Sequence, residues 1–332
     1  MPEQITIIGD GAMGMVCALL LSSNGHRVRI WGAFPADIEL LRSARENPRR
    51  LPHARLPDAI ELTADDTPAF ADTSLVICAV PTQHLRTVWT RLKPHFPASV
   101  PVVSCAKGIE TNSLLRPTQI IAEVLGPVVN LCALSGPNIA AEIARQLPAT
   151  AVAAGAATLT QRVQTAFSNR TFRVYTNDDV IGVEIAGAVK NIIALAAGMV
   201  DGLGLGCNAK AALLTRGLVE ITRLGVAMGA REETFYGLAG LGDLVTTCIS
   251  LDGRNRSTGE QLGKGRTLQE VLAGTASVVE GVPTTKAVKD LARRYKIEMP
   301  ITEAVHAILF ENVRPADALT QLMTRQSRPE RQ

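Results

Sequence analysis

The sequence predicts an α/β protein whose N-terminal domain contains a mostly parallel sheet and whose C-terminal domain is all helical. Two observations lead to this prediction. Short apolar runs alternate with helical patterns in the first half of the 332 residues, as they do in βαβ units. Strand patterns then stop near residue 177, and long helical stretches separated by Gly and Pro follow. We therefore expect one domain over residues 1–177 and a second, helical domain over residues 178–332.

The individual elements are predicted from the periodicity of apolar residues. Strands are expected at 5–8, 27–31, 75–80, 100–104, 130–134, 150–154 and 171–175. Between them, helices are expected at 13–23, 83–92 and 114–125. A further helix over 182–199 has the length of a membrane span, but Glu184 and Lys190 interrupt it, so we expect it to be buried in protein. The polar, basic residues 326–332 predict a frayed tail.

Composition argues against several classes of partner and site. The 34 basic and 31 acidic residues give a net charge of +3, too little to predict nucleic acid or an acidic membrane as a partner. The N-terminus lacks the pattern of a signal peptide, and the six cysteines include no Cys-x-x-Cys pair, so we expect a reducing, cytoplasmic location. The five histidines have no zinc-like spacing, and no metal site is expected.

A glycine-rich turn, Gly9-Asp-Gly11-Ala-Met-Gly14, joins the first predicted strand to the first predicted helix. In this G-x-G-x-x-G pattern Gly9 permits the turn, Gly11 lets a pyrophosphate approach the backbone, and Gly14 permits close packing of helix on strand. The helix N-terminus offers free N–H groups to the phosphates. The first domain is therefore expected to be Rossmann-like and to bind a dinucleotide. The alternative is a tight turn without a ligand.

The end of the second predicted strand leaves NAD and NADP both open as the cofactor. An acidic residue there would bind a ribose 2′-hydroxyl, and an arginine would favour a 2′-phosphate. The chain has neither of these in Trp31-Gly-Ala33. Arg49 and Arg50 could approach a 2′-phosphate, although solvated surface charge is the commoner role of such residues.

Lys190 is the most informative residue in the helical half, because the stretch around it is almost wholly apolar. An ammonium group there pays a desolvation cost unless it has partners or its pKa falls. A lysine with a lowered pKa is a candidate proton-transfer group. The alternative is a lysine whose stem lies along the helix while its head reaches water.

Other polar residues lie where open α/β sheets bind ligands. Lys107 and the turn at 135–138 each follow a predicted strand, at the carboxyl edge of the sheet. Asp243 lies in a glycine-rich turn between apolar runs, where it could orient a lysine or cap a helix. The Gly-Arg-Asn segment at 253–255 offers a guanidinium and an amide to a phosphate or carboxylate.

Together these segments resemble the bacterial-type NAD(P)-dependent glycerol-3-phosphate dehydrogenase family, from Ile5 to about Leu309. Besides the glycine-rich turn, the matching stretches lie at 47–52, 80–83, 106–110, 135–137, 172–175, 187–191, 208–211, 215–217, 240–244, 254–255, 278–281 and 298–301. The resemblance implies an oxidoreductase that interconverts sn-glycerol 3-phosphate and dihydroxyacetone phosphate by hydride transfer with NAD or NADP. It also implies a place in phospholipid biosynthesis.

The resemblance implies roles for individual residues as well. Lys190 would be the proton acceptor, with Lys107 and Asp243 as the other catalytic residues. The residues implied to bind the cofactor are Gly9, Gly11, Ala12, Met13, Gly14, Lys107, Ala140, Arg254, Val278 and Glu280. Those implied to bind the small phosphate substrate are Lys107, Gly136, Asn138, Lys190, Asp243, Gly253, Arg254 and Asn255.

Three departures from the family pattern alter contacts without removing a reacting group. Ala12 and Met13 stand where members commonly carry Ser and an aromatic residue, near the expected pyrophosphate. Ala33 stands where a basic residue is common, which weakens the expectation of a strong NADP preference. Gly253 stands where Ser is usual, so one hydroxyl contact is missing.

Two other functions are compatible with the same patterns. A related β-hydroxyacid dehydrogenase would share both domains and oxidise a carboxylate substrate, but the segments 107–110 and 253–255 argue against it. A non-catalytic dinucleotide sensor would keep the fold alone, and the retention of Lys107, Lys190 and Asp243 argues against that. The apolar helical domain is compatible with a homodimer.

Overall fold

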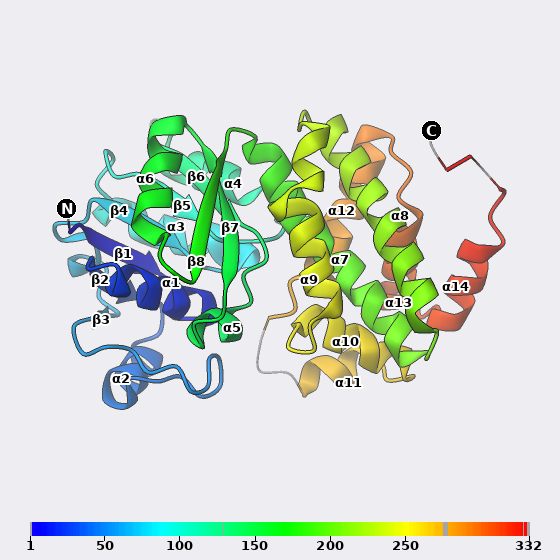
Figure 1. Ribbon diagram of the computed structural model, residues 1–332, viewed down its shortest axis with the longest axis horizontal. Helices are drawn as coiled ribbons and strands as arrows, with labels where there is room; N and C mark the ends of the chain where they lie inside the picture. Colours follow the sequence, from blue (N-terminus) through cyan, green and yellow to red (C-terminus); the bar gives the residue numbers. More distant parts are fainter. Residues whose placement is uncertain (1, 128, 275–277, 328, 331–332) are drawn as a thin grey trace.

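The computed structural model describes residues 2–127, 129–274, 278–327, 329 and 330, and it has two parts that lie side by side (Figure 1). The N-terminal part is a sheet with helices on both faces, and the C-terminal part is all helical. This arrangement confirms the predicted fold class.

The described residues form one sheet of eight strands, in the order β3-β2-β1-β4-β5-β6-β7-β8. Neighbouring strands are parallel except for β6 and β7, which are antiparallel. The strands are β1 (Gln4–Ile8), β2 (Arg27–Trp31), β3 (Glu61–Thr63), β4 (Leu75–Cys78), β5 (Val102–Ser104), β6 (Leu131–Ser135), β7 (Ala149–Gly155) and β8 (Phe172–Asn177).

Apolar side chains alternate between the two faces of the central strands, so each face has its own core. In β1, for example, Ile5 and Ile7 pack in one core cluster, and Ile8 packs in another. Helices cover both faces of the sheet, so the strands are buried on both sides, as in other parallel sheets. These helices are α1 (Ala12–Ser23), α2 (Pro35–Ala44), α3 (Leu85–Leu92), α4 (Pro117–Leu125), α5 (Ala140–Ala144) and α6 (Ala157–Phe167).

Two local predictions for this part differ from the structure. The helix expected at 114–125 begins only at Pro117, since proline pushes Arg116 into an extended conformation and is favoured as a first helical residue. Leu114 adopts a left-handed backbone conformation, with a φ of 61°. The strand β3 was not predicted, because its three residues are too few to show a periodic pattern.

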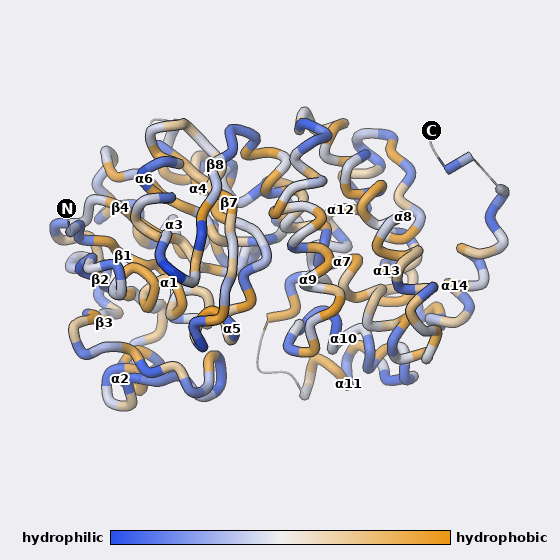
Figure 2. Tube along the Cα trace, viewed as in Figure 1, coloured by the Kyte–Doolittle hydropathy of each residue, from blue (hydrophilic) through white to orange (hydrophobic). Residues whose placement is uncertain are grey.

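The helical part is built around α7 (Val180–Gly202), in which every residue from 182 to 200 is buried. It is the one described helix long and apolar enough to cross a membrane, and 89% of its most apolar window is buried inside the protein. Figure 2 shows this apolar helix among its neighbours. The other α-helices described in this part are α8 (Gly206–Ala227), α9 (Asp243–Ile249), α10 (Arg254–Gly263), α11 (Leu268–Ala273), α12 (Gly281–Tyr295), α13 (Pro300–Phe310) and α14 (Pro315–Met323).

Glycines let α10 approach α7 closely. A Cβ atom on Gly198 would lie 1.9 Å from the Arg256 carbonyl oxygen, and one on Gly259 would lie 2.0 Å from the Leu195 carbonyl oxygen. Only hydrogen fits at these two positions, so the helix backbones touch. This contact places the start of α10 beside the middle of α7, where Lys190 lies. The tail predicted at 326–332 lies partly outside the described residues, and those described follow α14 without helix or strand.

Candidate active site

Lys190 lies in the middle of α7 with its ammonium group held by protein atoms. Its Nζ donates to Asp243 Oδ1 at 2.5 Å and to the Thr247 hydroxyl. The side chain is 7% exposed, so the alternative of a head group in water does not describe this lysine. Burial lowers the pKa of Lys190 to about 8, and the nearby charge of Lys107 lowers it as well, whereas Asp243 opposes both effects.

Asp243 joins the two lysines. Its Oδ1 accepts from Lys190, and its Oδ2 accepts from Lys107 Nζ at 2.7 Å, with the carboxylate almost fully buried. The residue opens α9 directly after a π-helical turn, Leu238–Gly242. Such wide turns are frequent at functional sites. Of the two roles predicted for Asp243, the structure shows the contact with lysine.

Lys107 reaches the same carboxylate from the sheet, three residues after β5 ends. Its Nζ also donates to the Gly136 carbonyl at 3.1 Å and to Asn138 Oδ1 at 2.9 Å, in the turn after β6. A Cβ on Gly187 of α7 would lie 2.9 Å from Ser135 Oγ, so this glycine lets α7 pack closely against the end of β6, beside Lys107. Two ammonium groups therefore share one buried carboxylate, and the cluster has an excess of positive charge.

Asn255 is buried and lies between three helices. Its Nδ2 donates to Asn191 Oδ1 at 2.9 Å, and its Oδ1 accepts from the Gly281 backbone N–H at 2.9 Å. Asn191 follows Lys190 on α7, so this network fixes α7 against the first turns of α10 and α12. An amide nitrogen carries two donors, so one Asn255 N–H remains for a ligand. Gly253, the residue before α10, packs close to the Thr247 carbonyl, where a Cβ would lie at 3.3 Å.

Glu280 connects the helical part to the α/β part, and Arg254 bonds the segment just before Glu280. Arg254 Nη1 donates to the Val278 carbonyl at 2.9 Å. Glu280 Oε1 accepts from the Thr82 backbone N–H at 3.2 Å, and its Oε2 is buried without a hydrogen-bond partner in the described part of the chain. Burial raises the pKa of Glu280 to about 7, although the Thr82 bond and Arg254 oppose the shift.

The glycine-rich turn has the geometry that a pyrophosphate needs. Gly9 has a φ of +116°, and a Cβ on Gly14 would lie 1.9 Å from the Gly9 carbonyl oxygen. Gly11 faces open space, where the nearest atom to a Cβ would be Arg50 Nη1 at 3.9 Å. Among the described residues no side chain caps the N-terminus of α1. These residues fit a dinucleotide phosphate, because the cradle and the free N–H groups coincide.

The remaining predicted cofactor residues surround this turn. Ala12 and Met13 form the first turn of α1, and Ala140 opens α5, which packs against α1. All three pack against the same core cluster.

The structure thus brings Lys107, Gly136, Asn138, Lys190 and Asp243 into one contact network. The remaining predicted residues lie in the glycine-rich turn, at α5 and in the 253–255 and 278–280 segments.

Sequence reasoning missed one residue that contacts this network and one that contacts Glu280. Thr247 was not predicted, although it follows Asp243 by four residues on α9 and so shares its helix face. Thr82 was not predicted either, since its contribution is a backbone N–H that carries no signal in the sequence.

Comparison with known proteins identifies the family. Residues 4–160 match the family model described as NAD-dependent glycerol-3-phosphate dehydrogenase N-terminus, and residues 179–320 match the corresponding C-terminus model. The chain belongs to the NAD-dependent glycerol-3-phosphate dehydrogenase family. This membership confirms the resemblance found in the sequence.

Relatives in this family match over nearly the whole chain. Glycerol-3-phosphate dehydrogenase [NAD(P)+] of Geobacter sp. (strain M21) is 47% identical, with 99% of each chain covered. The enzyme of the same name from Geobacillus kaustophilus is 45% identical, with 99% of this chain and 96% of the relative covered. The crystal structure of glycerol-3-phosphate dehydrogenase from Coxiella burnetii matches with a TM-score of 0.94 and 37% identity, over 98% and 99% of the two chains.

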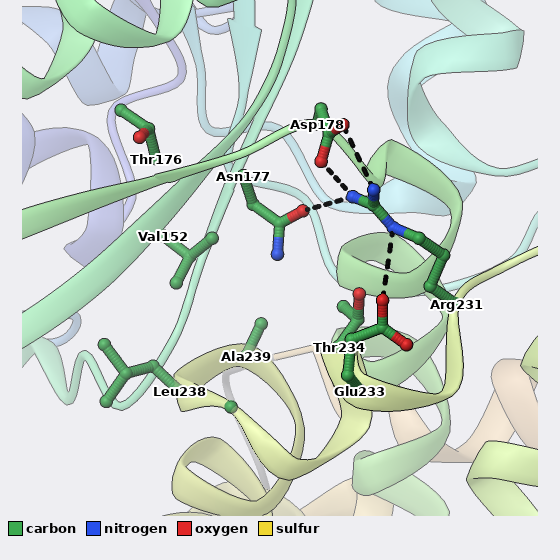
Figure 3. Close-up of a pocket in the computed structure, with 10 residues that line it drawn as sticks. Val152, Thr176, Asn177, Asp178, Arg231, Glu233, Thr234, Leu238 and Ala239 are labelled. Atoms are coloured by element: carbon green, nitrogen blue, oxygen red, sulfur yellow. Dashed lines mark hydrogen bonds and ion pairs between the residues drawn. The ribbon is translucent and has the colours of Figure 1, made fainter.

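A separate pocket of about 350 Å³ lies where β8 and the start of α7 meet the segment before α9 (Figure 3). Arg231 forms an ion pair with Asp178 there and donates to Asn177 Oδ1 at 3.3 Å. None of the residues that line this pocket belongs to the predicted site.

Proposed function

We propose that this chain interconverts sn-glycerol 3-phosphate and dihydroxyacetone phosphate, using NAD or NADP. The observation that carries the proposal is the shared contact of Lys190 and Lys107 with the buried Asp243, in a member of this family. The nicotinamide, when bound, accepts or supplies the hydride at C2 of the substrate. The residues of the chain then have to position the substrate and move one proton.

Lys190 is the proton-transfer group in this proposal. In its neutral form it accepts the C2 hydroxyl proton during oxidation, and as an ammonium it returns that proton during reduction. A pKa of about 8 suits this role, because a general acid–base group works best when its pKa lies near the operating pH. Asp243 orients Lys190, and Lys107 places positive charge near the oxygen that becomes an alkoxide.

The substrate phosphate is held by the Gly253, Arg254 and Asn255 segment in this proposal. The Arg254 guanidinium offers charged donors, and Asn255 has one amide N–H left. Gly136 and Asn138 lie beside Lys107, because both accept from its Nζ, and in this proposal they line the same substrate site.

The dinucleotide would lie along the glycine-rich turn. Gly9, Gly11 and Gly14 form the cradle, and the N–H groups of Ala12 and Met13 face the pyrophosphate. Lys107, Ala140, Arg254, Val278 and Glu280 would contact the nicotinamide half, where the Glu280–Thr82 bond joins the two parts of the chain.

We also propose that the two domains divide after residue 177, that the protein is cytoplasmic, and that it forms a homodimer. The division is supported by the change from β8, which ends at Asn177, to α7, which begins at Val180. Exposed apolar side chains in the helical part, Ile249 and Leu251 among them, support self-association.

An initial-rate assay tests the proposed reaction. Dihydroxyacetone phosphate is offered with NADH and with NADPH, and a β-ketoacid is offered in parallel. We expect coenzyme oxidation with dihydroxyacetone phosphate alone. Turnover of the β-ketoacid in its place would support a β-hydroxyacid dehydrogenase. Tight coenzyme binding without turnover of either substrate would support a dinucleotide sensor.

A further inference from the structure

The glycine-rich turn has a guanidinium beside it that the proposed reaction does not use. Arg50 Nη1 lies 3.4 Å from Asp10 Oδ1 in the turn itself, and Arg50 Nη2 lies 3.4 Å from Asp37 Oδ2 in the first turn of α2. The Arg50 side chain is 40% exposed. Both contacts are near the outer limit of a hydrogen bond, so a better anion can replace them.

The backbone around Arg50 is fixed although its side chain is accessible. The Arg50 and Leu51 backbone N–H groups both donate to the Asn47 carbonyl, at 3.2 and 2.8 Å. Leu51 is 1% exposed and packs in the core of the α/β part. The turn therefore presents Arg50 at a defined place beside Gly11.

That place corresponds to the ribose end of the dinucleotide. Asp10 lies against the carboxyl end of β2, because a Cβ on Gly32 would be 3.2 Å from Asp10 Cγ. In Rossmann-like folds this strand end is where the 2′ position of the adenosine ribose is recognised. The chain has Ala33 there, and Trp31-Gly-Ala33 offers no acidic or basic side chain to bind the ribose.

Arg91, the other arginine at this strand end, is already engaged. It bonds the Ala33 carbonyl at 3.0 Å and Asp66 Oδ2 at 2.8 Å, and it stacks on the Trp31 ring. In the described part of the chain, the Arg50 side chain has only the two long contacts, so it can exchange them for an anion at this position.

We propose that Arg50 binds the 2′-phosphate of NADP(H), and that Asp37 competes with that phosphate for the same guanidinium. When the coenzyme is NAD(H), Asp10 and Asp37 keep Arg50 in place. A guanidinium suits a phosphate because its donors match two oxygens at once. The inference rests on the proposed dinucleotide site and adds the residue that sets coenzyme preference.

Calorimetric titration with NADPH and NADH, in the absence of substrate, tests the proposal on four proteins: wild type, Arg50→Ala, Arg49→Ala and Asp37→Asn. We expect Arg50→Ala to weaken NADPH binding at least about tenfold and NADH binding less than about twofold. Asp37→Asn should strengthen NADPH binding, because it removes the competitor. Arg49→Ala removes the same charge from an exposed neighbour and should change neither.

Each other result overturns the proposal. If Arg50→Ala weakened the binding of NADPH and NADH equally, Arg50 would lie at the pyrophosphate instead. Equal effects of Arg50→Ala and Arg49→Ala, or no effect of either, would mean that Arg50 is solvated surface charge. If the wild type bound neither coenzyme, the dinucleotide site itself would fail, and this result is distinct from binding of both without a role for Arg50.

Discussion

Two charged residues on the same buried helix, Glu184 and Lys190, have opposite surroundings. Glu184 is matched by one cation, since it forms an ion pair with Arg116 and accepts from the Thr118 N–H and hydroxyl at 2.7 Å each. Lys190 shares its counter-ion, Asp243, with a second lysine. Less than two turns of α7 therefore separate Glu184, whose charge is neutralised by its partner, from Lys190, whose charge is not.

This difference indicates a structural role for the buried Glu184 and a chemical role for the buried Lys190. The Glu184 cluster is neutral when its members are ionised, and it ties α7 to the start of α4. The Lys190 cluster keeps one surplus positive charge, and burial lowers the pKa of Lys190 to about 8. An unbalanced buried group whose pKa lies near neutral pH can exchange a proton, and strongly perturbed groups of this kind are common at active sites.

Replacing Lys190 should have the largest effect on turnover. We expect Lys190→Ala to lower kcat about a hundred- to ten-thousand-fold, because it removes general acid–base transfer. Lys264→Ala, which removes an exposed lysine directly after α10, is the matched control and should leave kcat within about twofold. Steady-state kinetics with calorimetric Kd values for the coenzyme would measure both. Near-normal turnover in Lys190→Ala would contradict a chemical role for Lys190.

Replacing Glu184 should affect stability instead of chemistry. Glu184→Ala leaves the Arg116 guanidinium buried without its partner, which typically costs about 3–5 kcal/mol of unfolding free energy. Urea denaturation of this variant should show the loss, while the folded enzyme keeps its pH profile. The double variant Glu184→Met, Arg116→Met should regain much of the stability. A change in the pH profile of Glu184→Ala would contradict a purely structural role.

Replacing Asp243 should sharpen the comparison by leaving Lys190 without its counter-ion. Since the charge of Asp243 raises the pKa of Lys190, Asp243→Asn should move the titration of Lys190 below pH 8. Misplacement of both lysines should also reduce kcat about a hundredfold. The pH dependence of kcat/KM measures the shift, and an unchanged or raised apparent pKa would refute the assignment.

The smallest effect is expected from Thr247, whose hydroxyl accepts from Lys190. Thr247→Val keeps the shape and removes one hydrogen bond, which is worth about 1 kcal/mol, or roughly fivefold in kcat/KM. Initial rates across a substrate range would show it. Thr246→Val, whose hydroxyl bonds the Gly242 carbonyl instead, is the control on the adjacent residue.

The sequence predicted the parts of this molecule whose signals are local. The glycine-rich turn, the apolar helix that carries Lys190 and the position of Lys107 after β5 are all visible in short stretches. The antiparallel pairing of β6 with β7 is not visible, because the residue pattern of a strand does not show its direction relative to its neighbour. Likewise β3 is too short to show a pattern.

The convergence of the charged residues could not be derived from local patterns. Lys190 and Asp243 are 53 residues apart, and Lys107 and Asp243 are 136 apart. Asp243 directly follows the π-helical turn before α9, and Gly187 lets α7 pack closely against Ser135 at the end of β6. Only the family resemblance pointed to this convergence. The family resemblance also could not show that Asn255 forms hydrogen bonds with Asn191 and Gly281.

The pH dependence of kcat/KM in both directions tests the central claim, that Lys190 exchanges the substrate proton. Oxidation of glycerol 3-phosphate requires neutral Lys190, so its rate should rise with pH and level off above about 8. Reduction of dihydroxyacetone phosphate requires the ammonium form, so its rate should be level at lower pH and fall above about 8. Rates that change in the same direction, or that show no titration between about pH 7 and 9, would contradict the account.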